Sequence, residues 1–322
     1  MIKVALIGIG GMGKVHFDEY MKNPETQIVA VADVRTDMAK EKVNDENIRI
    51  YADMDELLAN EDVDLVDIST PSYMHAEQSI KALKKGKHVI CEKPMSISSE
   101  DTSKMIEAAR ESGKLYMTAH VVRFMSPYVY LKSIIDSGEL GKIVHIDMKR
   151  ISAIPRWSWE DWMRDIKKSG GNPFDMSIHD IDFVQYAFGM PKSVSGVYNK
   201  MKNDNDYVIS NLVYDDFTAT ITGGWFNCDI AFKAEYAAIF ENGWVESKDG
   251  KVYKNGEEVE IGKGEVSADT GINLSGLDGY ADEIAYFVSC IKNGTQPEMV
   301  TPESSEDSVK LVERILENSI II

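Results

Sequence analysis

The first third of the chain alternates short, almost wholly apolar runs with amphipathic segments. Runs of this kind are typical of parallel strands that are buried on both faces, and the segments between them have helical periodicity. The regular alternation predicts βαβ units with right-handed crossovers, and therefore a doubly wound α/β domain over residues 1–120. The expected strands are residues 3–7, 28–32, 49–51, 64–68, 88–91 and 115–118.

After residue 120 the pattern changes to strands separated by hairpin-like turns. A helical segment at 128–135 comes first and ends at a glycine. We therefore predict a second domain, residues 121–322, of the α+β class with a large, mostly antiparallel sheet. Two helices close it, and the last, 302–318, is a candidate to pack back on the first domain. The expected strands are 143–148, 193–198, 207–213, 218–222, 233–240, 243–245 and 251–254.

A glycine-rich turn, Gly8-Ile9-Gly10-Gly11-Met12-Gly13, directly follows the first apolar run. It fits the spacing G-x-G-x-x-G. Gly8 permits a tight turn, Gly10 lets the backbone approach a pyrophosphate, and Gly13 lets the next helix pack closely on the strand. The N-terminus of that helix offers unpaired N–H groups to phosphate oxygens. The turn, with Gly11 and Met12 inside it, predicts that the first domain is a Rossmann dinucleotide-binding domain.

An acidic residue closes the second apolar run. Asp33 lies 20 residues after Gly13, the spacing of the acid that binds a ribose diol. Its negative charge would repel a 2′-phosphate, which favours NAD. Arg35 softens that preference, so NADP is the alternative cofactor.

The fifth apolar run ends abruptly at Glu92-Lys93-Pro94. Proline has no N–H and excludes the helical conformation from the residue before it, so the strand cannot continue directly into a helix. Lys93 is therefore expected at the carboxyl end of a strand, where ligands bind in open α/β sheets. The alternative is an exposed Glu–Lys pair before a loop.

A second candidate site starts at Gly170-Gly171 and continues as a predicted helix through Phe188. Asp175 and His179 are four residues apart and would share one helix face. A carboxylate beside an imidazole orients it and favours its protonated form, as suits a base that takes a hydroxyl proton near neutral pH. Asp182 is an alternative partner for His179, or a ligand of backbone groups.

Two other interpretations of this segment stay open. One is an ordinary acid–imidazole pair on the surface. The other is a divalent metal site on Asp175, His179 and Asp182, which the absence of an HExxH motif or a cysteine ligand set disfavours, so we expect no metal.

Composition narrows the function classes. The formal net charge of −18 disfavours a nucleic acid or an anionic membrane as partner. Cys91, Cys228 and Cys290 form no CxxC motif and are typical of reduced thiols, and no apolar run approaches the roughly 18 residues of a membrane helix. We expect a cytoplasmic protein that binds a small molecule.

Taken in order, these motifs resemble the glucose–fructose oxidoreductase/inositol dehydrogenase/rhizopine-catabolism (Gfo/Idh/MocA) family. Arg123-Phe124 and the turn at 137–141 extend the resemblance along the chain, and the segment 178–182 is especially similar to inositol dehydrogenases. The motifs that carry it are the glycine turn, Asp33, Thr70-Pro71 with His75, Glu92-Lys93-Pro94, and Gly170-Gly171 with Asp175, His179, Asp180 and Asp182.

The resemblance implies oxidation of a secondary alcohol of a sugar or cyclitol, with hydride transfer to the nicotinamide. Lys93 would hydrogen-bond the reacting hydroxyl and orient the cofactor, with a cis peptide to Pro94. His179 would be the general base, and Asp175 its partner or a ligand of a substrate hydroxyl. The other cofactor contacts that it implies are Thr70, Pro71, His75 and Glu92.

Further along the chain, Arg123 and the tryptophans Trp157, Trp159 and Trp162 are candidates for the substrate pocket. Tryptophan rings suit the C–H side of a sugar, but three of them in a short span also suit core anchors. The fold class also predicts association of copies through the outer face of the sheet, as a dimer or tetramer. A non-catalytic nucleotide or sugar sensor on the same scaffold is the alternative function.

Overall fold

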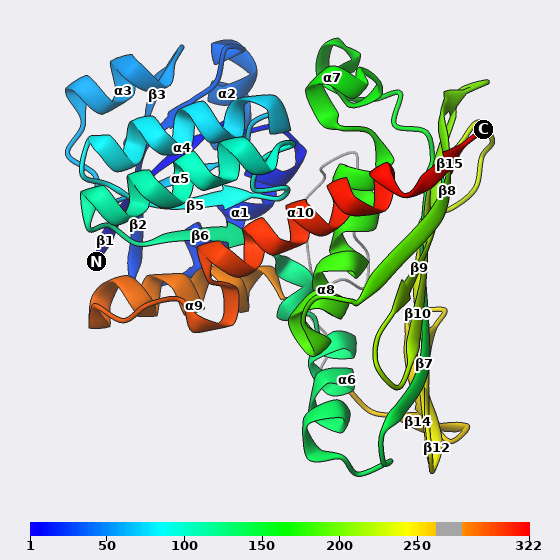
Figure 1. The fold of residues 1–322 in the computed structure, drawn as a ribbon. Helices are drawn as coiled ribbons and strands as arrows, with labels where there is room; N and C mark the ends of the chain where they lie inside the picture. Colours follow the sequence, from blue (N-terminus) through cyan, green and yellow to red (C-terminus); the bar gives the residue numbers. More distant parts are fainter. Residues whose placement is uncertain (262–278) are drawn as a thin grey trace. The chain divides into compact units, whose positions relative to one another are not determined.

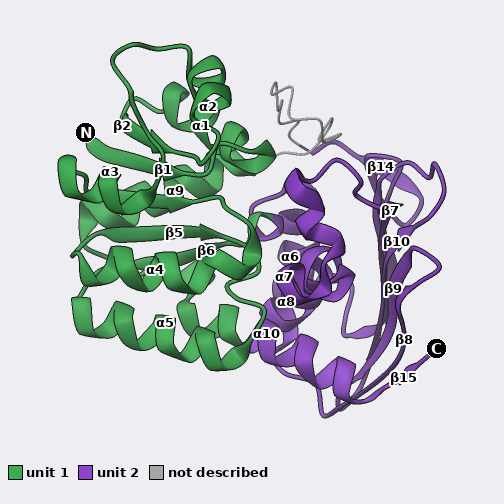
Figure 2. Ribbon diagram, turned by 90° about the horizontal axis from the view of Figure 1, so that it is seen from above, with its two compact units in different colours: residues 1–121, 265–306 green, residues 122–264, 307–322 purple. Residues whose placement is uncertain are grey.

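The computed structural model describes residues 1–261 and 279–322. The chain divides into two compact units (Figure 2). The first comprises residues 1–121 and, among the described residues, 279–306; the second comprises 122–261 and 307–322. The units therefore differ from the expected domains of 1–120 and 121–322, because residues 279–306 group with the first unit. The boundary near the C-terminus falls inside helix α10, Pro302–Glu317.

The first unit contains a six-stranded parallel sheet in the order β3-β2-β1-β4-β5-β6 (Figure 1). The strand order reverses between β1 and β4, which is the switch point where doubly wound sheets bind ligands. The predicted class of this domain is confirmed. The strands are β1 Ile2–Ile7, β2 Thr26–Ala32, β3 Arg49–Tyr51, β4 Leu65–Ile68, β5 His88–Glu92 and β6 Tyr116–Ala119.

Helices cover both faces of this sheet. Figure 2 shows α4 and α5 on one face and α1 and α9 on the other. Leu6, Leu65 and Ile90 are fully buried between the layers, as apolar side chains of a two-faced strand must be. The helices are α1 Gly11–Lys22, α2 Thr36–Val43, α3 Met54–Asn60, α4 His75–Lys84, α5 Ser99–Ser112 and α9 Tyr280–Asn293.

The second unit contains a nine-stranded sheet in the order β14-β13-β12-β11-β7-β10-β9-β8-β15. It is mostly antiparallel, as predicted, although β7 with β10 and β8 with β15 pair in parallel. The strands are β7 Ile143–Ala153, β8 Ser193–Lys202, β9 Asn205–Val213, β10 Thr218–Phe226, β11 Lys233–Phe240, β12 Gly243–Lys248, β13 Lys251–Lys254, β14 Glu257–Val259 and β15 Ser319–Ile321.

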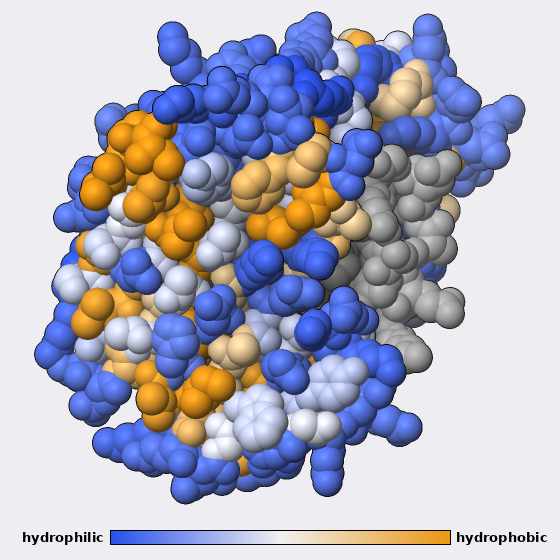
Figure 3. Space-filling view, turned by 90° about the vertical axis from the view of Figure 1, so that its right-hand side faces the viewer, coloured by the Kyte–Doolittle hydropathy of each residue, from blue (hydrophilic) through white to orange (hydrophobic). Residues whose placement is uncertain are grey.

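One face of this sheet packs against helices, with α8 lying on β7 and β10. The helices are α6 Ser126–Ser137, α7 Ile166–Ser169, α8 Ile178–Phe188 and the C-terminal part of α10. On the opposite face, apolar side chains gather between polar ones, as Figure 3 shows.

The segment before Phe188 is helical, as predicted, but its first turn is not α-helical. Pro173–Ser177 forms a π-helical turn, and the regular α8 starts only at Ile178. The turn packs very closely on β10, because a Cβ on Gly223 would lie 1.8 Å from the Ser177 Oγ. Such π-helical turns often occur at functional sites.

Candidate active site

The glycine turn has the shape of a phosphate cradle. A Cβ on Gly8, whose φ is +86°, would lie 2.8 Å from the Ser69 carbonyl oxygen, and one on Gly13 would lie 2.0 Å from the Gly8 oxygen. Both positions therefore require glycine. A Cβ on Gly10 would meet nothing within 4 Å, so the backbone is open there to a ligand.

Helix α1 starts within the same turn, at Gly11, and Met12 and Gly13 lie in its first turn. That turn contains no acidic side chain that would repel a phosphate. The N–H groups at this helix end and the opening at Gly10 together fit the pyrophosphate of a dinucleotide.

Asp33 follows β2 and joins it to the glycine turn. Its Oδ2 accepts a hydrogen bond from the Ile9 N–H at 3.1 Å, and its Oδ1 accepts one from the Arg35 N–H at 2.9 Å. The Arg35 Nε lies 3.3 Å from Oδ1, so part of the Asp33 charge is compensated, as Arg35 was expected to do. The carboxylate stands where the ribose of a dinucleotide bound on the glycine turn is expected.

Lys42 is a cation at this turn that sequence reasoning missed. Its Nζ donates to the carbonyl oxygens of Ile9 at 3.0 Å and Gly10 at 2.9 Å. Burial, together with the nearby charge of Arg35, lowers the pKa of Lys42. No motif marks this lysine, because it lies more than 30 residues from the turn and reaches it only through the fold.

Lys93 lies directly after β5, as predicted, and the peptide bond between Lys93 and Pro94 is cis. The side chain is half-buried. The carboxylate of Glu92 turns inward: its Oε2 accepts from the Lys93 N–H at 3.0 Å, and its Oε1 lies 3.2 Å from the His16 Nε2. A contact of Glu92 with the cofactor stays a prediction.

Three further cofactor candidates lie together at the same edge of the sheet. His75 is buried between two carbonyl oxygens, with its Nδ1 2.8 Å from that of Pro94 and its Nε2 2.8 Å from that of Thr70, and its neutral ring donates to one of them at a time. Burial lowers the pKa of His75. Pro71 follows Thr70 directly, so the imidazole connects the segment after β4 to the Lys93-Pro94 peptide. The first unit thus brings its predicted residues together.

In the second unit, Asp175 lies in the π-helical turn and His179 in the first turn of α8. Both side chains are half-buried. The structure therefore leaves both accessible to a small molecule in part, and their partnership stays a prediction.

Two ion pairs hold the helix that carries His179. Asp180 accepts from Arg150 through both carboxylate oxygens, at 2.8 and 3.2 Å, and Arg150 also donates to the Tyr128 hydroxyl at 2.8 Å. Asp180 and Arg150 are both almost completely buried. Burial raises the pKa of Tyr128, which keeps its hydroxyl neutral.

The second pair joins Asp182 and Arg123. The Arg123 Nη2 and Nε donate to the two carboxylate oxygens at 2.7 and 2.9 Å, and the Ser308 Oγ donates at 2.7 Å. Asp182 therefore binds a guanidinium. This contact argues against Asp182 as the partner of His179 and against a metal site on Asp175, His179 and Asp182. Arg123 is only 3% exposed, and its predicted substrate contact stays a prediction.

The three tryptophans predicted for the substrate pocket, Trp157, Trp159 and Trp162, differ in their surroundings. Trp157 is 54% exposed, whereas Trp162 packs against an apolar cluster of Ile154, Met163, Met176 and Trp225. Trp159 is the first residue of a short helical turn, Trp159–Arg164, that also contains Trp162.

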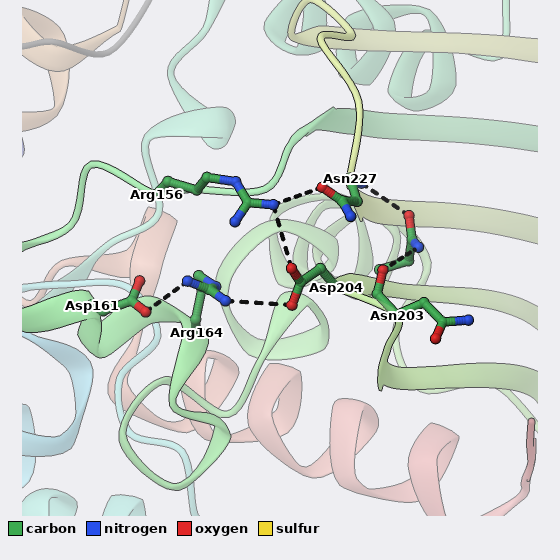
Figure 4. Close-up of polar contacts among 7 residues, drawn as sticks. Arg156, Asp161, Arg164, Asn203, Asp204 and Asn227 are labelled. Carbon is green, nitrogen blue, oxygen red and sulfur yellow. Dashed lines mark hydrogen bonds and ion pairs between the residues drawn. The ribbon is translucent and has the colours of Figure 1, made fainter.

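Arginines anchor this segment to the turn between β8 and β9. Arg156 and Arg164 each lie 3.4 Å from the Asp204 carboxylate, and Arg156 donates to the Asn227 side chain at 2.6 Å; Figure 4 marks these contacts with dashed lines. Arg164 also pairs with Asp161 at 2.8 Å. These contacts are partly exposed, so they fix the segment only modestly.

Comparison with known proteins identifies the family of the chain. The model of the oxidoreductase family with an NAD-binding Rossmann fold matches residues 2–120, and the model of the GFO/IDH/MocA C-terminal domain matches residues 128–246. The chain belongs to the Gfo/Idh/MocA oxidoreductase family, and its first unit is an NAD-binding Rossmann domain. No helix of the described residues has the length and apolar character needed to cross a membrane.

The chain is similar to relatives of differing activity. The 2,7-anhydro-N-acetylneuraminate hydratase of Mediterraneibacter gnavus is 33% identical over 193 residues, which are 59% of this chain and 50% of that protein. The glucose-6-phosphate 3-dehydrogenase of Bacillus subtilis is 32% identical over 209 residues, 63% of this chain and 59% of that protein. The myo-inositol 2-dehydrogenase of Thermotoga maritima is 32% identical over 191 residues, 58% and 55% respectively. The matched part of the chain thus spans between half and three fifths of the length of these relatives.

Solved structures show the same fold over almost the whole chain. The myo-inositol 2-dehydrogenase of Lactobacillus plantarum has a TM-score of 0.82 at 23% identity, covering 98% of this chain and 96% of that one. An oxidoreductase of Agrobacterium radiobacter, solved with NAD+, L-tartaric acid and magnesium, has a TM-score of 0.82 at 16% identity, with coverage of 98% and 96%.

Proposed function

We propose that the chain is a dehydrogenase that uses NAD to oxidise a secondary hydroxyl of a sugar or cyclitol. The main support for the proposal is that the glycine turn, Asp33 and Lys93 lie at the carboxyl edge of one parallel sheet. A cation at that edge, beside a dinucleotide cradle, suits the polarisation of an alcohol oxygen. The similarity to a glucose-6-phosphate 3-dehydrogenase and a myo-inositol 2-dehydrogenase supports the substrate class.

Each residue has a distinct task in this proposal. Bound NAD would supply the acceptor for the hydride of the carbinol carbon. The Lys93 ammonium donates a hydrogen bond to the reacting oxygen and stabilises the negative charge that develops there. His179 takes the hydroxyl proton, and Asp175 favours the imidazolium that results.

We assign the substrate contact within the tryptophan segment to Trp157, because it is the exposed ring. Trp162 and Arg123 then act indirectly, the first by packing and the second by holding Asp182. Trp157→Ala should raise KM for the substrate several-fold while NAD affinity is unchanged, since an apolar contact of this size contributes about 1–2 kcal/mol. An unchanged KM would remove Trp157 from the site.

Asp33 is proposed to select NAD over NADP, because Arg35 compensates its charge only in part. Titration with both cofactors should give tighter binding of NAD. Asp33→Ser should bring the two affinities together, and a wild-type preference for NADP would contradict the assignment.

We also propose that the chain forms a homo-oligomer through the exposed face of its large sheet. Five apolar side chains, Val144, Ile209, Val213, Ile239 and Trp244, are each 39–48% exposed on its strands. Ile209→Glu with Ile239→Glu should shift the sedimentation coefficient to that of a monomer, while Met190→Glu, an exposed change outside the sheet, should not. A monomeric wild type would overturn this proposal.

The test of the proposed activity is nicotinamide absorbance with purified protein, NAD, and a panel of cyclitols, aldoses and nucleotide sugars. Lys93→Ala should abolish most turnover and leave NAD binding nearly intact, and His179→Ala should remove the ionisation of the base from the pH–rate profile. Lys85→Ala, an exposed lysine near the start of the same strand, is the matched control. Equal activity of Lys93→Ala and wild type would contradict the assigned role.

A hydration reaction on an anhydro sugar is the second candidate, because two hydratases of 2,7-anhydro-N-acetylneuraminate, from M. gnavus and Escherichia coli, are 33% and 31% identical. Mass spectrometry separates the two candidates: a hydratase product gains one water without net accumulation of NADH. NAD binding with no product of either kind would favour the non-catalytic sensor. A cytoplasmic location stays a prediction.

A further inference from the structure

A buried cluster of charged side chains includes Glu92, the residue directly before Lys93. His16 comes from helix α1, Asp67 from β4 and Glu92 from β5, all within the first unit. The His16 Nδ1 lies 2.8 Å from the Asp67 Oδ2, and its Nε2 lies 3.2 Å from the Glu92 Oε1. His16 and Asp67 are completely buried. One imidazole thus lies between the carboxylates of two neighbouring strands.

The charges around His16 fit an imidazolium: its Nδ1 is hydrogen-bonded to Asp67, and its Nε2 contacts Glu92 as an ion pair without a hydrogen bond. Asp67 also accepts from the Tyr20 hydroxyl at 2.9 Å and from the Ser69 hydroxyl at 2.8 Å, so it behaves as an ionised acceptor. Glu92 accepts from a backbone N–H in the same way. Two ionised carboxylates in a protein core need a cation between them, and a protonated His16 supplies it.

Helix α9 also borders the cluster. The Tyr280 ring centroid lies 6.4 Å from that of the imidazole, and burial, Asp67 and Glu283 together raise the pKa of the Tyr20 hydroxyl, which therefore stays a donor. Burial alone would lower the pKa of His16, but Asp67 and Glu92 together hold it well above its ordinary value. Burial would raise the pKa of Glu92, but the pair with His16 keeps it below its usual range.

The cluster connects two parts of the cofactor and substrate machinery. His16 lies three residues after Gly13, on the helix whose N-terminus forms the phosphate cradle. Glu92 binds the backbone N–H of Lys93 at 3.0 Å. A displacement of Glu92 would therefore move the backbone from which the Lys93 ammonium extends.

We propose that His16 is a positioning residue, whose imidazolium fixes the Glu92 carboxylate and, through it, the backbone of Lys93. The helix that holds the cofactor phosphates and the strand that presents the lysine are then coupled through one protonated side chain. The catalytic part of this inference rests on the role proposed for Lys93; the structural part does not.

The first test needs no substrate. In nitrogen-15-labelled protein without cofactor, the His16 ring should show an imidazolium spectrum at neutral pH and titrate well above His88, which lies at the other end of β5 and whose pKa burial lowers. His16→Gln should shift the Lys93 amide resonance and accelerate its hydrogen exchange, while His88→Asn leaves both unchanged. A neutral His16 ring, or an unaltered Lys93 amide in His16→Gln, would overturn the proposal.

Should His16→Gln fail to fold, Glu92→Gln serves in its place, because it retains the shape and removes one negative charge. It should lower the pH at which His16 titrates and shift the Lys93 amide. If neither changes, the bridge does not exist.

The second test uses any compound of the panel that the wild type turns over. His16→Gln should lower kcat by about 10- to 100-fold, as expected for a misplaced catalytic group, with little change in the Kd for NAD. Its pH–rate profile should gain an ionisation, because burial raises the pKa of a carboxyl that has lost its cation. His16→Gln combined with Glu92→Gln should remove that ionisation. An unchanged kcat would contradict the positioning role, whereas a wild type without turnover would refute the proposed function and leave the spectroscopic result to decide on the bridge.

Discussion

The two units support their candidate catalytic side chains with buried charges in different ways. In the first unit, one imidazole serves two carboxylates, Asp67 and Glu92. In the second, the two carboxylates of α8 that follow His179, Asp180 and Asp182, each bind their own guanidinium. The first unit therefore has one imidazole for two carboxylates, whereas the second has one guanidinium for each carboxylate.

The difference has a consequence for pH. Arginine stays protonated at every pH that a protein survives, so the ion pairs beside His179 are permanent. An imidazolium loses its proton as the pH rises, even when neighbouring carboxylates delay the loss. We infer that the support of Lys93 is titratable and that the support of His179 is not.

The largest effect is expected from removing a guanidinium. Arg150→Met leaves the buried carboxylate of Asp180 without its cation, which should cost about 3–5 kcal/mol of unfolding free energy. All five tryptophans of the chain lie in the second unit, so urea unfolding followed by tryptophan fluorescence measures this loss there.

Two variants control that experiment. Arg150→Met with Asp180→Leu should recover most of the loss, since an apolar replacement of a buried pair is often nearly neutral. Arg156→Met, which breaks an exposed pair with Asp204, should cost less than about 1 kcal/mol. If Arg150→Met costs no more than Arg156→Met, the buried pair does not hold α8.

A smaller effect is expected from alkaline pH, because a deprotonated His16 still occupies its place. The raised pKa of His16 means that its contribution to stability is complete below the ordinary value of about 6.5 and is lost as the pH rises through the raised value. Far-ultraviolet circular dichroism reports on both units, whereas tryptophan fluorescence reports on the second. As the pH is raised, the urea midpoint measured by circular dichroism should therefore begin to fall at a lower pH than the midpoint measured by fluorescence. If the urea midpoints of the wild type and of His16→Gln fell in the same way as the pH is raised, this expectation would be contradicted.

Asp206 is a buried carboxylate of the second unit that, unlike Asp180 and Asp182, binds a backbone N–H instead of a guanidinium. Its Oδ2 accepts from the Asn172 N–H at 2.7 Å beside the Gly170-Gly171 turn, and burial raises its pKa to about 6. An acid with a raised pKa favours the folded state at low pH and opposes it above that pKa. Asp206→Asn should add about 1–3 kcal/mol of stability at pH 8 and flatten the dependence between pH 4 and 7. Destabilisation at pH 8 would show that the charge is needed.

The smallest effect concerns a cation that binds carbonyl oxygens instead of a carboxylate. Lys42→Met should weaken NAD binding by about tenfold, because the glycine turn loses a donor to two carbonyls and a positive charge near the phosphates. Lys40→Met, on the exposed side of the same helix, is the control. Equal affinities of the two variants for NAD in a calorimetric titration would remove Lys42 from the cradle.

Features encoded by short-range patterns could be predicted. The apolar runs gave the strands of the first sheet to within about two residues, a common boundary error, and the glycine spacing placed the cradle. Asp33 and Lys93 could be placed because each closes a strand, and the carboxyl ends of parallel strands share one edge.

Contacts between residues far apart in the chain could not be predicted. Arg123 meets Asp182 across 59 residues, and Lys42 meets the glycine turn across more than 30, through packing that no local spacing encodes. His16 contacts both Asp67 and Glu92 because these residues belong to β4 and β5, which are neighbours in the sheet. The π-helical turn at Pro173–Ser177 depends likewise on Gly223 of a distant strand.

The most direct test of the central claim is the nicotinamide absorbance assay with NAD and the panel of cyclitols, aldoses and nucleotide sugars. We expect formation of NADH with at least one member, its loss in Lys93→Ala, and no loss in Lys85→Ala. NAD binding without NADH formation from any of them, or NADH formation that persists unchanged in Lys93→Ala, would contradict the assignment of the chain as a dehydrogenase that acts through Lys93.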